Sequence, residues 1–76
     1  MNIALVLINT EAGFEEAILE KLKKTKNVKE AFIVYGVYDI IAKVEAEDLE
    51  ELRSVISTRL RRIEGVKSTV TLIVIS

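Results

Sequence analysis

Apolar residues divide the chain into four segments with the pattern of strands and two with that of helices. The run 3–8 is unbroken isoleucine, alanine, leucine and valine, and this favours a strand buried on both faces. A second strand is expected at about 28–35. A third is expected at about 38–46, where apolar and polar positions alternate. The nearly continuous apolar and threonine run 66–75 predicts the fourth strand.

The segment 14–24 predicts an amphipathic helix. Phe14, Ile18 and Leu22 recur at every fourth position, with charged residues between them. Glutamates come early and lysines late, which complements the helix dipole. Thr10 or a residue just after it is expected to cap this helix.

A second helix is expected to begin after Asp48. Glu51 follows three residues later, which is the arrangement of a capping box. Apolar residues at helical spacing continue from Leu49 to Ile63, and arginines gather near the end. Gly65 is placed to take a left-handed conformation after this helix.

This order predicts an α+β fold of the ferredoxin-like βαββαβ type, formed by 1–76 as one domain. Right-handed crossovers place both helices on one face of a four-stranded antiparallel sheet. The other face would then leave apolar side chains bare, because the first and last strands are apolar on both sides. We therefore expect a homodimer made sheet to sheet, with a different covering protein as the alternative.

Composition narrows the possible functions. The chain has 76 residues, 50 % of them hydrophobic, and contains no cysteine, histidine or proline. Disulfides and thiolate or imidazole metal sites are therefore excluded, and no cofactor is expected. The formal charge of −1 gives no field that would attract nucleic acid or a membrane. The sequence begins without a leader pattern, so we expect a soluble, cytoplasmic protein.

One carboxylate follows a glycine turn in the middle of the chain. The run 32–42 is expected to form a hairpin with a two-residue type II′ turn at Gly36-Val37. Asp39 would either be solvated or paired with a lysine, or accept from a ligand ammonium. In the second case backbone N–H groups left accessible by Gly36 would meet the carboxylate of an α-amino acid.

Other polar residues near this turn have plainer interpretations. Tyr35 and Tyr38 would line a pocket or pack into an interface. Thr69 and Thr71 would be ordinary strand residues, or would supply hydroxyl groups if the fourth strand lies near a neighbouring subunit's turn.

Catalytic motifs are scarce. The serines and threonines on the second helix have no evident base beside them. The three glycines are dispersed singly, so no phosphate-binding loop exists, and the first strand has no aromatic residue with which to stack RNA bases.

The run Gly-Val-Tyr-Asp-Ile-Ile-Ala-Lys-Val, a helix, and then Ile-Glu-Gly-Val-Lys-Ser-Thr-Val-Thr-Leu-Ile-Val-Ile resemble the effector-binding module of the leucine-responsive (Lrp/AsnC) transcription regulators. This module is also called RAM, for regulation of amino acid metabolism. The resemblance extends over essentially the whole chain. Glu64 stands where the family often has proline, which concerns only the exit from the helix.

The resemblance implies a module that dimerises through its sheets into an α/β-barrel-like dimer. Dimers assemble further into rings, commonly octamers, and amino acids bind between dimers. It carries Gly36, Tyr38 and Asp39 over as site residues, with Asp39 for the ligand ammonium, and also Thr69 and Thr71. The helix-turn-helix domain of the family has no room in this sequence, so a stand-alone form without direct nucleic-acid binding is expected.

These expectations combine into an oligomeric module that senses a small amino acid, is not an enzyme, and shares its interface with full-length Lrp/AsnC regulators. The alternative from another class is a small dimeric ferredoxin-like enzyme of the monooxygenase or isomerase type, in which Tyr38 and Asp39 would transfer protons. A structural oligomeriser without a ligand is the third possibility.

Overall fold

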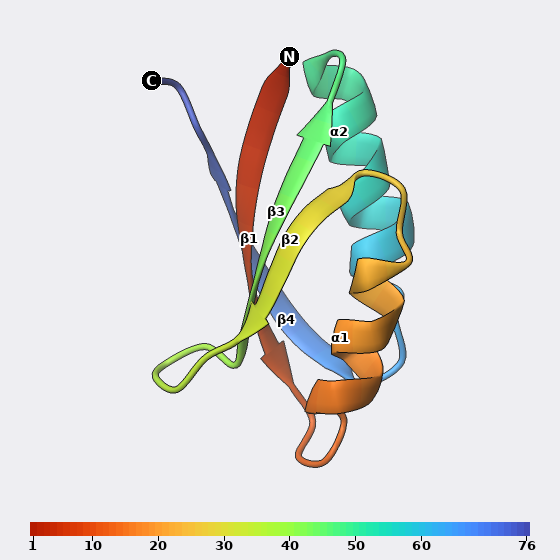
Figure 1. Ribbon diagram of the computed structural model, residues 1–76, viewed down its shortest axis with the longest axis vertical. Coiled ribbons are helices and arrows are strands. Elements are labelled where there is room, and N and C mark those ends of the chain that lie inside the picture. The colour runs from red at the N-terminus through yellow and green to blue at the C-terminus, as the bar shows by residue number, and fades with distance from the viewer.

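The computed structural model describes residues 1–76 (Figure 1). Its elements are β1 (Asn2–Thr10), α1 (Glu15–Lys23), β2 (Val28–Ile33), β3 (Ile40–Ala46), α2 (Leu49–Val55), a π-helical continuation η1 (Ile56–Leu60) and β4 (Val66–Ile73). The predicted ferredoxin-like βαββαβ order is therefore confirmed. None of the helices has the length and apolar character needed to cross a membrane.

The strands form one antiparallel sheet in the order β2-β3-β1-β4. The continuous apolar run of β1 thus has a neighbour on each side. Val6 lies opposite Ala42 and Thr71, while Leu7 lies opposite Ile41 and Val70. Because side chains alternate along a strand, these two rows point to opposite faces of the sheet.

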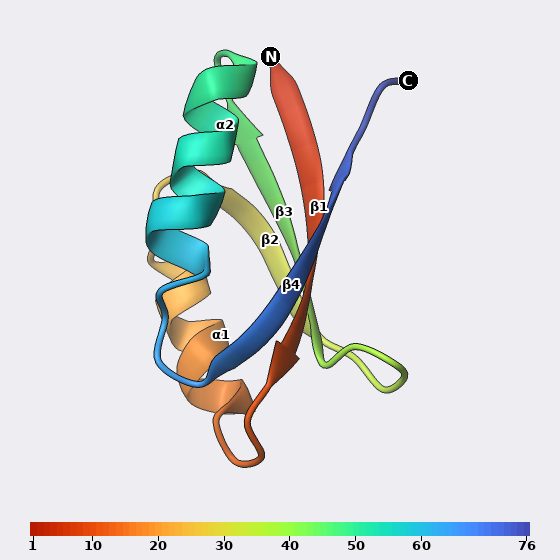
Figure 2. The ribbon, with the colours of Figure 1, turned by 180° about the vertical axis from the view of Figure 1, so that it is seen from behind.

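Both helices cover one face of the sheet, as expected (Figures 1 and 2). The core lies between them and the sheet, and the alternating pattern of β3 is confirmed because Ile40, Ala42 and Val44 are buried there. The largest fully buried side chains are Val6, Ile8, Ile18, Leu22, Ile40, Val44, Leu52 and Leu60. Ile18 and Leu22 come from the predicted apolar stripe of α1.

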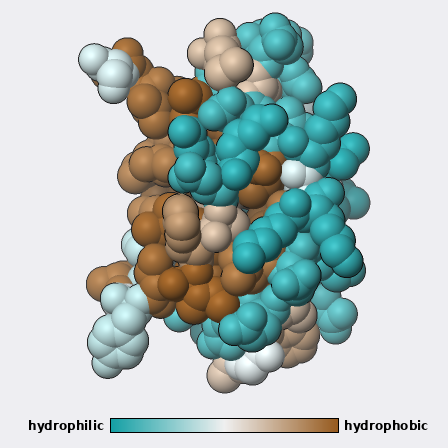
Figure 3. Space-filling view, viewed as in Figure 1, coloured by the Kyte–Doolittle hydropathy of each residue, from teal (hydrophilic) through white to brown (hydrophobic).

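The other face carries no helix. We call it the open sheet face, and it presents Leu5, Leu7, Phe32, Ile41, Val70 and Leu72. Phe32 is 54 % exposed and Leu72 is 48 % exposed. In Figure 3 apolar side chains gather on this side of the molecule, and charged ones cover the helices.

The predicted cap of α1 is wrong. The residue at the N-cap is Phe14, whose side chain makes no capping hydrogen bond. Thr10 is the last residue of β1, is buried, and donates its N–H to Asp39. Between Thr10 and α1 the chain passes through Gly13, where φ is +91°. The dipole is instead complemented by Glu15 and Glu16 in the first turn.

The start of α2 follows the prediction, with one difference. The Asp48 carboxylate accepts from the backbone N–H of Glu51 at 2.8 Å. The Glu51 carboxylate accepts from the backbone N–H of Glu47 at 3.2 Å, one residue before the N-cap, so the reciprocal bond of the box is shifted.

The second helix ends earlier than predicted. After Val55 the helix widens into η1, and the Arg61 N–H donates to the Ile56 carbonyl at 3.0 Å, five residues back. Ile63 lies beyond the helix, in the turn before β4. Gly65 does have a positive φ, +98°, but it belongs to that turn rather than to the helix end.

The expected two-residue turn at Gly36-Val37 is also wrong. The Val34 N–H donates to the Asp39 carbonyl at 2.8 Å and closes a longer loop. A type II′ turn requires a positive φ at its first central residue, and φ of Gly36 is not positive. The register is fixed from the other side of β3, where the Asp39 N–H donates to the Ile8 carbonyl at 3.0 Å. The ladder between β2 and β3 ends at the pair of Ile33 and Ile40.

Candidate functional site

The loop 34–39 projects from one end of the sheet toward the side that carries no helix (Figures 1 and 2). Tyr35 is fully exposed and Val37 is 85 % exposed, so neither packs within the chain. Gly36 has open space around it, with no atom within 4 Å of the position a Cβ would take. The tip of the loop is therefore free to contact another molecule.

Asp39 is anchored at the base of this loop. Its Oδ2 accepts from the Thr10 backbone N–H at 2.9 Å and from the Thr10 hydroxyl at 3.4 Å. Thr10 lies at the end of β1, beyond the first residue of β3, Ile40. There the Asp39 side chain, rather than a strand carbonyl, accepts from the Thr10 N–H. The expected ion pair with a lysine is absent. Asp39 is part-buried, so its carboxylate is only partly solvated. Its Oδ1 makes no hydrogen bond within the chain.

Thr69 and Thr71 lie on the far side of β1 from Asp39. They are opposite Ile8 and Val6, so both threonines share the helix-covered face of the sheet. Neither hydroxyl makes a hydrogen bond within the chain, and Thr71 is exposed. One copy of the chain therefore does not bring the threonines together with the 34–39 loop, and their joint role as a site stays a prediction.

A groove that the sequence did not predict lies between β4 and the second helix. Figure 2 shows β4 diverging from α2 as it runs toward the C-terminus. The groove has a volume of about 360 Å³ and is lined by Arg53, Ile56, Ser57, Arg61, Thr71 and Ile73. We call it the β4–α2 groove. The spacing of Arg53, Ser57 and Arg61, every fourth residue on one helix, was the only sequence signal for it.

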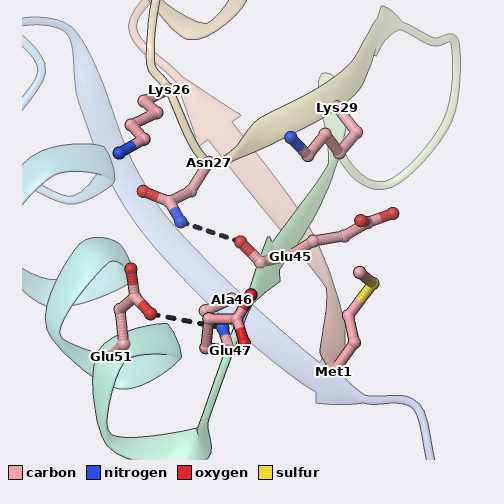
Figure 4. Close-up of a pocket in the computed structure, with 8 residues that line it drawn as sticks. All are labelled: Met1, Lys26, Asn27, Lys29, Glu45, Ala46, Glu47 and Glu51. Atoms are coloured by element: carbon pink, nitrogen blue, oxygen red, sulfur yellow. Dashed lines mark hydrogen bonds between the residues drawn. The ribbon is translucent and has the colours of Figure 1, made fainter.

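A second cleft, of about 240 Å³, lies at the opposite end of the sheet from the loop (Figure 4). Lys26 and Lys29 border it together with three glutamates, so its charges are of both signs. Several of its polar groups are already bonded within the chain. The Asn27 amide donates to the Glu45 carbonyl at 2.9 Å, and Glu51 accepts from Glu47.

Comparison with known proteins decides the family. The family model for the Lrp/AsnC ligand binding domain matches residues 3–76, which is nearly the whole chain. The chain belongs to the Lrp/AsnC family. The match includes the loop, the open sheet face and the β4–α2 groove.

Similar proteins place this Lrp/AsnC domain in different settings. The crystal structure of FFRP-DM1 matches it with a TM-score of 0.95 and 41 % identity, covering 99 % of this chain and 100 % of that one. An HTH-type transcriptional regulator of Pyrococcus horikoshii is 34 % identical over 97 % of this chain and 47 % of its own length. A homocitrate synthase of Sulfurisphaera tokodaii is 37 % identical over 95 % of this chain and 16 % of its own length.

The chain thus spans about half the length of the curated regulators that it matches, and a smaller part of the synthase. The shared segment is the Lrp/AsnC domain alone. Regulators and a biosynthetic enzyme both carry a similar segment, so that segment does not imply one whole-protein activity. The family match and the regulator relatives support a regulatory, effector-binding module for this chain.

Proposed function

We propose that this chain is a non-catalytic regulatory module that binds a small amino acid between its copies and has no DNA-binding surface of its own. The observation that carries the proposal is the Lrp/AsnC family match over residues 3–76. The geometry of the loop and of the open sheet face supports it.

The open sheet face supports a homodimer. Leu5, Leu7 and Ile41 lie at its centre and are half-buried in the single chain, while Phe32 and Leu72 are about half exposed. Removing such a surface from water contributes about 25 cal/mol per Å² of apolar area. This gain acts against the entropic cost of association. The domain is also near the lower size limit at which a single hydrophobic core is enough for folding. Pairing two sheets would enlarge the apolar core that stabilises each chain.

Asp39 supports recognition of an amino-acid ammonium group. Its Oδ2 is held by Thr10, which orients the carboxylate, and its Oδ1 remains available. Tyr38 is half-buried beside it, and Gly36 leaves the loop backbone open to approach by a ligand carboxylate. The loop is where a ligand would touch this chain first.

The threonines complete the site only across an assembly. Thr69 and Thr71 lie on β4 with free hydroxyl groups, away from the loop of their own chain. A ring of dimers, an octamer in its expected form, would bring β4 of one copy to the 34–39 loop of another. The ligand then lies at a contact between dimers, and full-length Lrp/AsnC regulators are candidates for sharing that contact.

A distant structural neighbour shows an amino acid on the same fold. A transcriptional regulator of Neisseria meningitidis, crystallised as a complex with L-Met, matches this chain with a TM-score of 0.89 at 16 % identity, over 99 % of this chain and 50 % of that one. At this identity only the fold is shared, so the complex describes that protein. It supports the proposal to the extent that this fold can hold an amino acid.

The mechanism follows from linkage. A ligand bound across a contact between dimers stabilises the assembly by RT ln(1 + [L]/Kd), so effector concentration sets the oligomeric state. Acid–base chemistry is not needed for this response. The absence of histidine and cysteine and the partial coverage of homocitrate synthase agree with a module that regulates rather than reacts.

Calorimetric titration of the chain with the twenty amino acids tests this proposal. We expect at least one amino acid to bind and to shift the sedimentation coefficient. Asp39→Asn keeps an acceptor for Thr10 but removes the charge, and it should weaken binding about tenfold or more. Glu64→Gln, an exposed carboxylate outside the loop, serves as the control and should bind as the wild type does.

Two results would count against the proposal. The first is that no amino acid binds the wild-type chain at millimolar concentration. The second is equal binding by the wild type and Asp39→Asn, which would remove the assigned role of that carboxylate.

A further inference from the structure

The β4–α2 groove combines cationic, hydroxyl and apolar groups in one place. Arg53 and Arg61 border it, Ser57 and Thr71 contribute hydroxyl groups, and Ile56 and Ile73 supply the apolar part. Its volume of about 360 Å³ lies within the range of small-molecule sites in proteins, roughly 300–1,000 Å³. No acidic residue lines it, in contrast to the cleft of Figure 4.

The two arginines are not neutralised within the chain. The single ion pair of the structure joins Lys43 to Glu45 on β3, away from the groove. Arg53 and Arg61 are both exposed and have no carboxylate partner, so the groove has a net positive charge. A guanidinium group binds a carboxylate through two parallel hydrogen bonds, and this makes each arginine a candidate anchor for one carboxylate.

The π-helical turn η1 aligns these arginines. In an uninterrupted α-helix, residues eight positions apart are rotated by about 80° relative to each other. The Arg61 N–H bonds to the Ile56 carbonyl, five residues back, so this turn holds more residues and each contributes less rotation. The rotation between Arg53 and Arg61 is therefore smaller than about 80°. Arg61 lies two turns after Arg53 on nearly the same side of the helix as Ser57. Such turns are often found at functional sites.

The groove also stays open when the sheet is covered. Thr71 and Ile73 point to the helix side of β4, whereas Val70 and Leu72 belong to the open sheet face. A partner seated on the open sheet face would leave the groove accessible. The groove is thus separate from the proposed sheet-to-sheet contact within a dimer, while its Thr71 also belongs to the site proposed between dimers.

From these observations we infer that the β4–α2 groove binds a small dicarboxylate, with Arg53 and Arg61 each holding one carboxylate and the Thr71 hydroxyl donating to one of them. The isoleucines would pack against the short carbon chain between the two ends. Two sources share this chemistry, namely an acidic amino acid and the corresponding 2-oxo acid. The inference adds an anionic class of ligand to the proposed amino-acid effector. The groove shares Thr71 with the proposed amino-acid site but does not include Asp39.

Isothermal titration with L-glutamate and with 2-oxoglutarate tests the inference, with L-leucine as a monocarboxylate comparison. We expect at least one dicarboxylate to bind the wild-type chain, and to bind more tightly than leucine. Tighter binding of glutamate would assign the source to the amino acid, and tighter binding of 2-oxoglutarate to the oxo acid. Both outcomes support the groove as a dicarboxylate site.

Matched arginine variants locate the site. Arg53→Gln and Arg61→Gln should each weaken binding at least about tenfold, because each removes a charge-assisted pair. Arg59→Gln and Arg62→Gln change the net charge equally, at exposed positions that do not line the groove, and should bind as the wild type does. Backbone amide resonances of Ser57 and Thr71 should shift on titration.

Three results would overturn the inference: no binding of either dicarboxylate, equal weakening in all four arginine variants, or leucine binding as tightly as the dicarboxylates. The two proposals can fail separately. L-Glutamate binding that is lost in Asp39→Asn but kept in Arg53→Gln and Arg61→Gln would leave the proposed function intact and remove the groove site. Dicarboxylate binding that survives Asp39→Asn, together with no difference between Asp39→Asn and the wild type for any other amino acid, would keep the groove site and remove the role of Asp39.

Discussion

The carboxylate of Asp39 accepts a 2.9 Å hydrogen bond from the backbone N–H of Thr10, at the point where β1 shifts its register against β4. Thr10 is the one buried polar residue of the chain. The bond ties the base of the 34–39 loop to the central strand of the sheet. Asp39 therefore has a structural role in addition to any contact with a ligand, and the two roles require different substitutions to separate them.

Asp39→Ala should lower the free energy of unfolding by about 1–3 kcal/mol, because the Thr10 N–H would lose its acceptor while remaining buried. Asp39→Asn should cost less, since the amide oxygen can still accept. Urea unfolding followed by circular dichroism measures both. If the two variants unfold at the same urea concentration as the wild type, the bond contributes nothing to stability.

Substitution by alanine should destabilise the fold at Gly65 but leave its stability nearly unchanged at Gly36. At Gly65 a Cβ would lie 2.5 Å from the Phe14 ring, and φ is +98°, so Gly65→Ala should destabilise the fold by at least about 2 kcal/mol. At Gly36 the space is open and φ is not positive, so Gly36→Ala should unfold within about 0.5 kcal/mol of the wild type. Thermal melts of the two variants provide the comparison, and similar losses would contradict it.

The order of elements could be predicted because it depends on local patterns. The four-residue spacing of Ile18 and Leu22 and the alternation along β3 each survive in the buried set of the structure. The conformation of the 34–39 loop could not be predicted. The base of this loop is held by hydrogen bonds between Asp39 and both Ile8 and Thr10, which are about thirty residues away in the chain.

The site was predictable only in part, for the same reason. Asp39 could be singled out as a carboxylate near a glycine. The hydrogen bond that its Oδ2 accepts from Thr10 could not be predicted, because it depends on how β1 and β3 lie next to each other in the sheet. The β4–α2 groove joins Arg53 and Arg61 on a helix to Thr71 on a strand whose direction diverges from that helix. Neither this divergence nor the π-helical turn has a signature in the hydrophobic pattern.

Asp48→Ala should destabilise the chain by about 1 kcal/mol, the usual value of an N-cap. The Asp48 carboxylate bonds the Glu51 N–H at 2.8 Å, and alanine leaves that donor to water. Asp48→Ser retains an acceptor and is the matched control, expected to remain close to the wild type. Equal stability of the alanine and serine variants in thermal unfolding would show that the cap is not needed.

Leu72→Asp should convert the proposed dimer into a monomer. Leu72 lies on the open sheet face opposite Leu5, so a carboxylate there would have to be buried without a partner when two sheets meet. For the wild type we expect a sedimentation mass of at least twice that of the chain and a melting temperature that rises with protein concentration. Leu72→Asp should lose both properties. Ala17→Asp, which adds the same charge on the exposed side of α1, should retain them. A wild-type chain that sediments as a stable monomer at micromolar concentration would refute pairing through this face, and an oligomeric Leu72→Asp variant would move the contact to another surface.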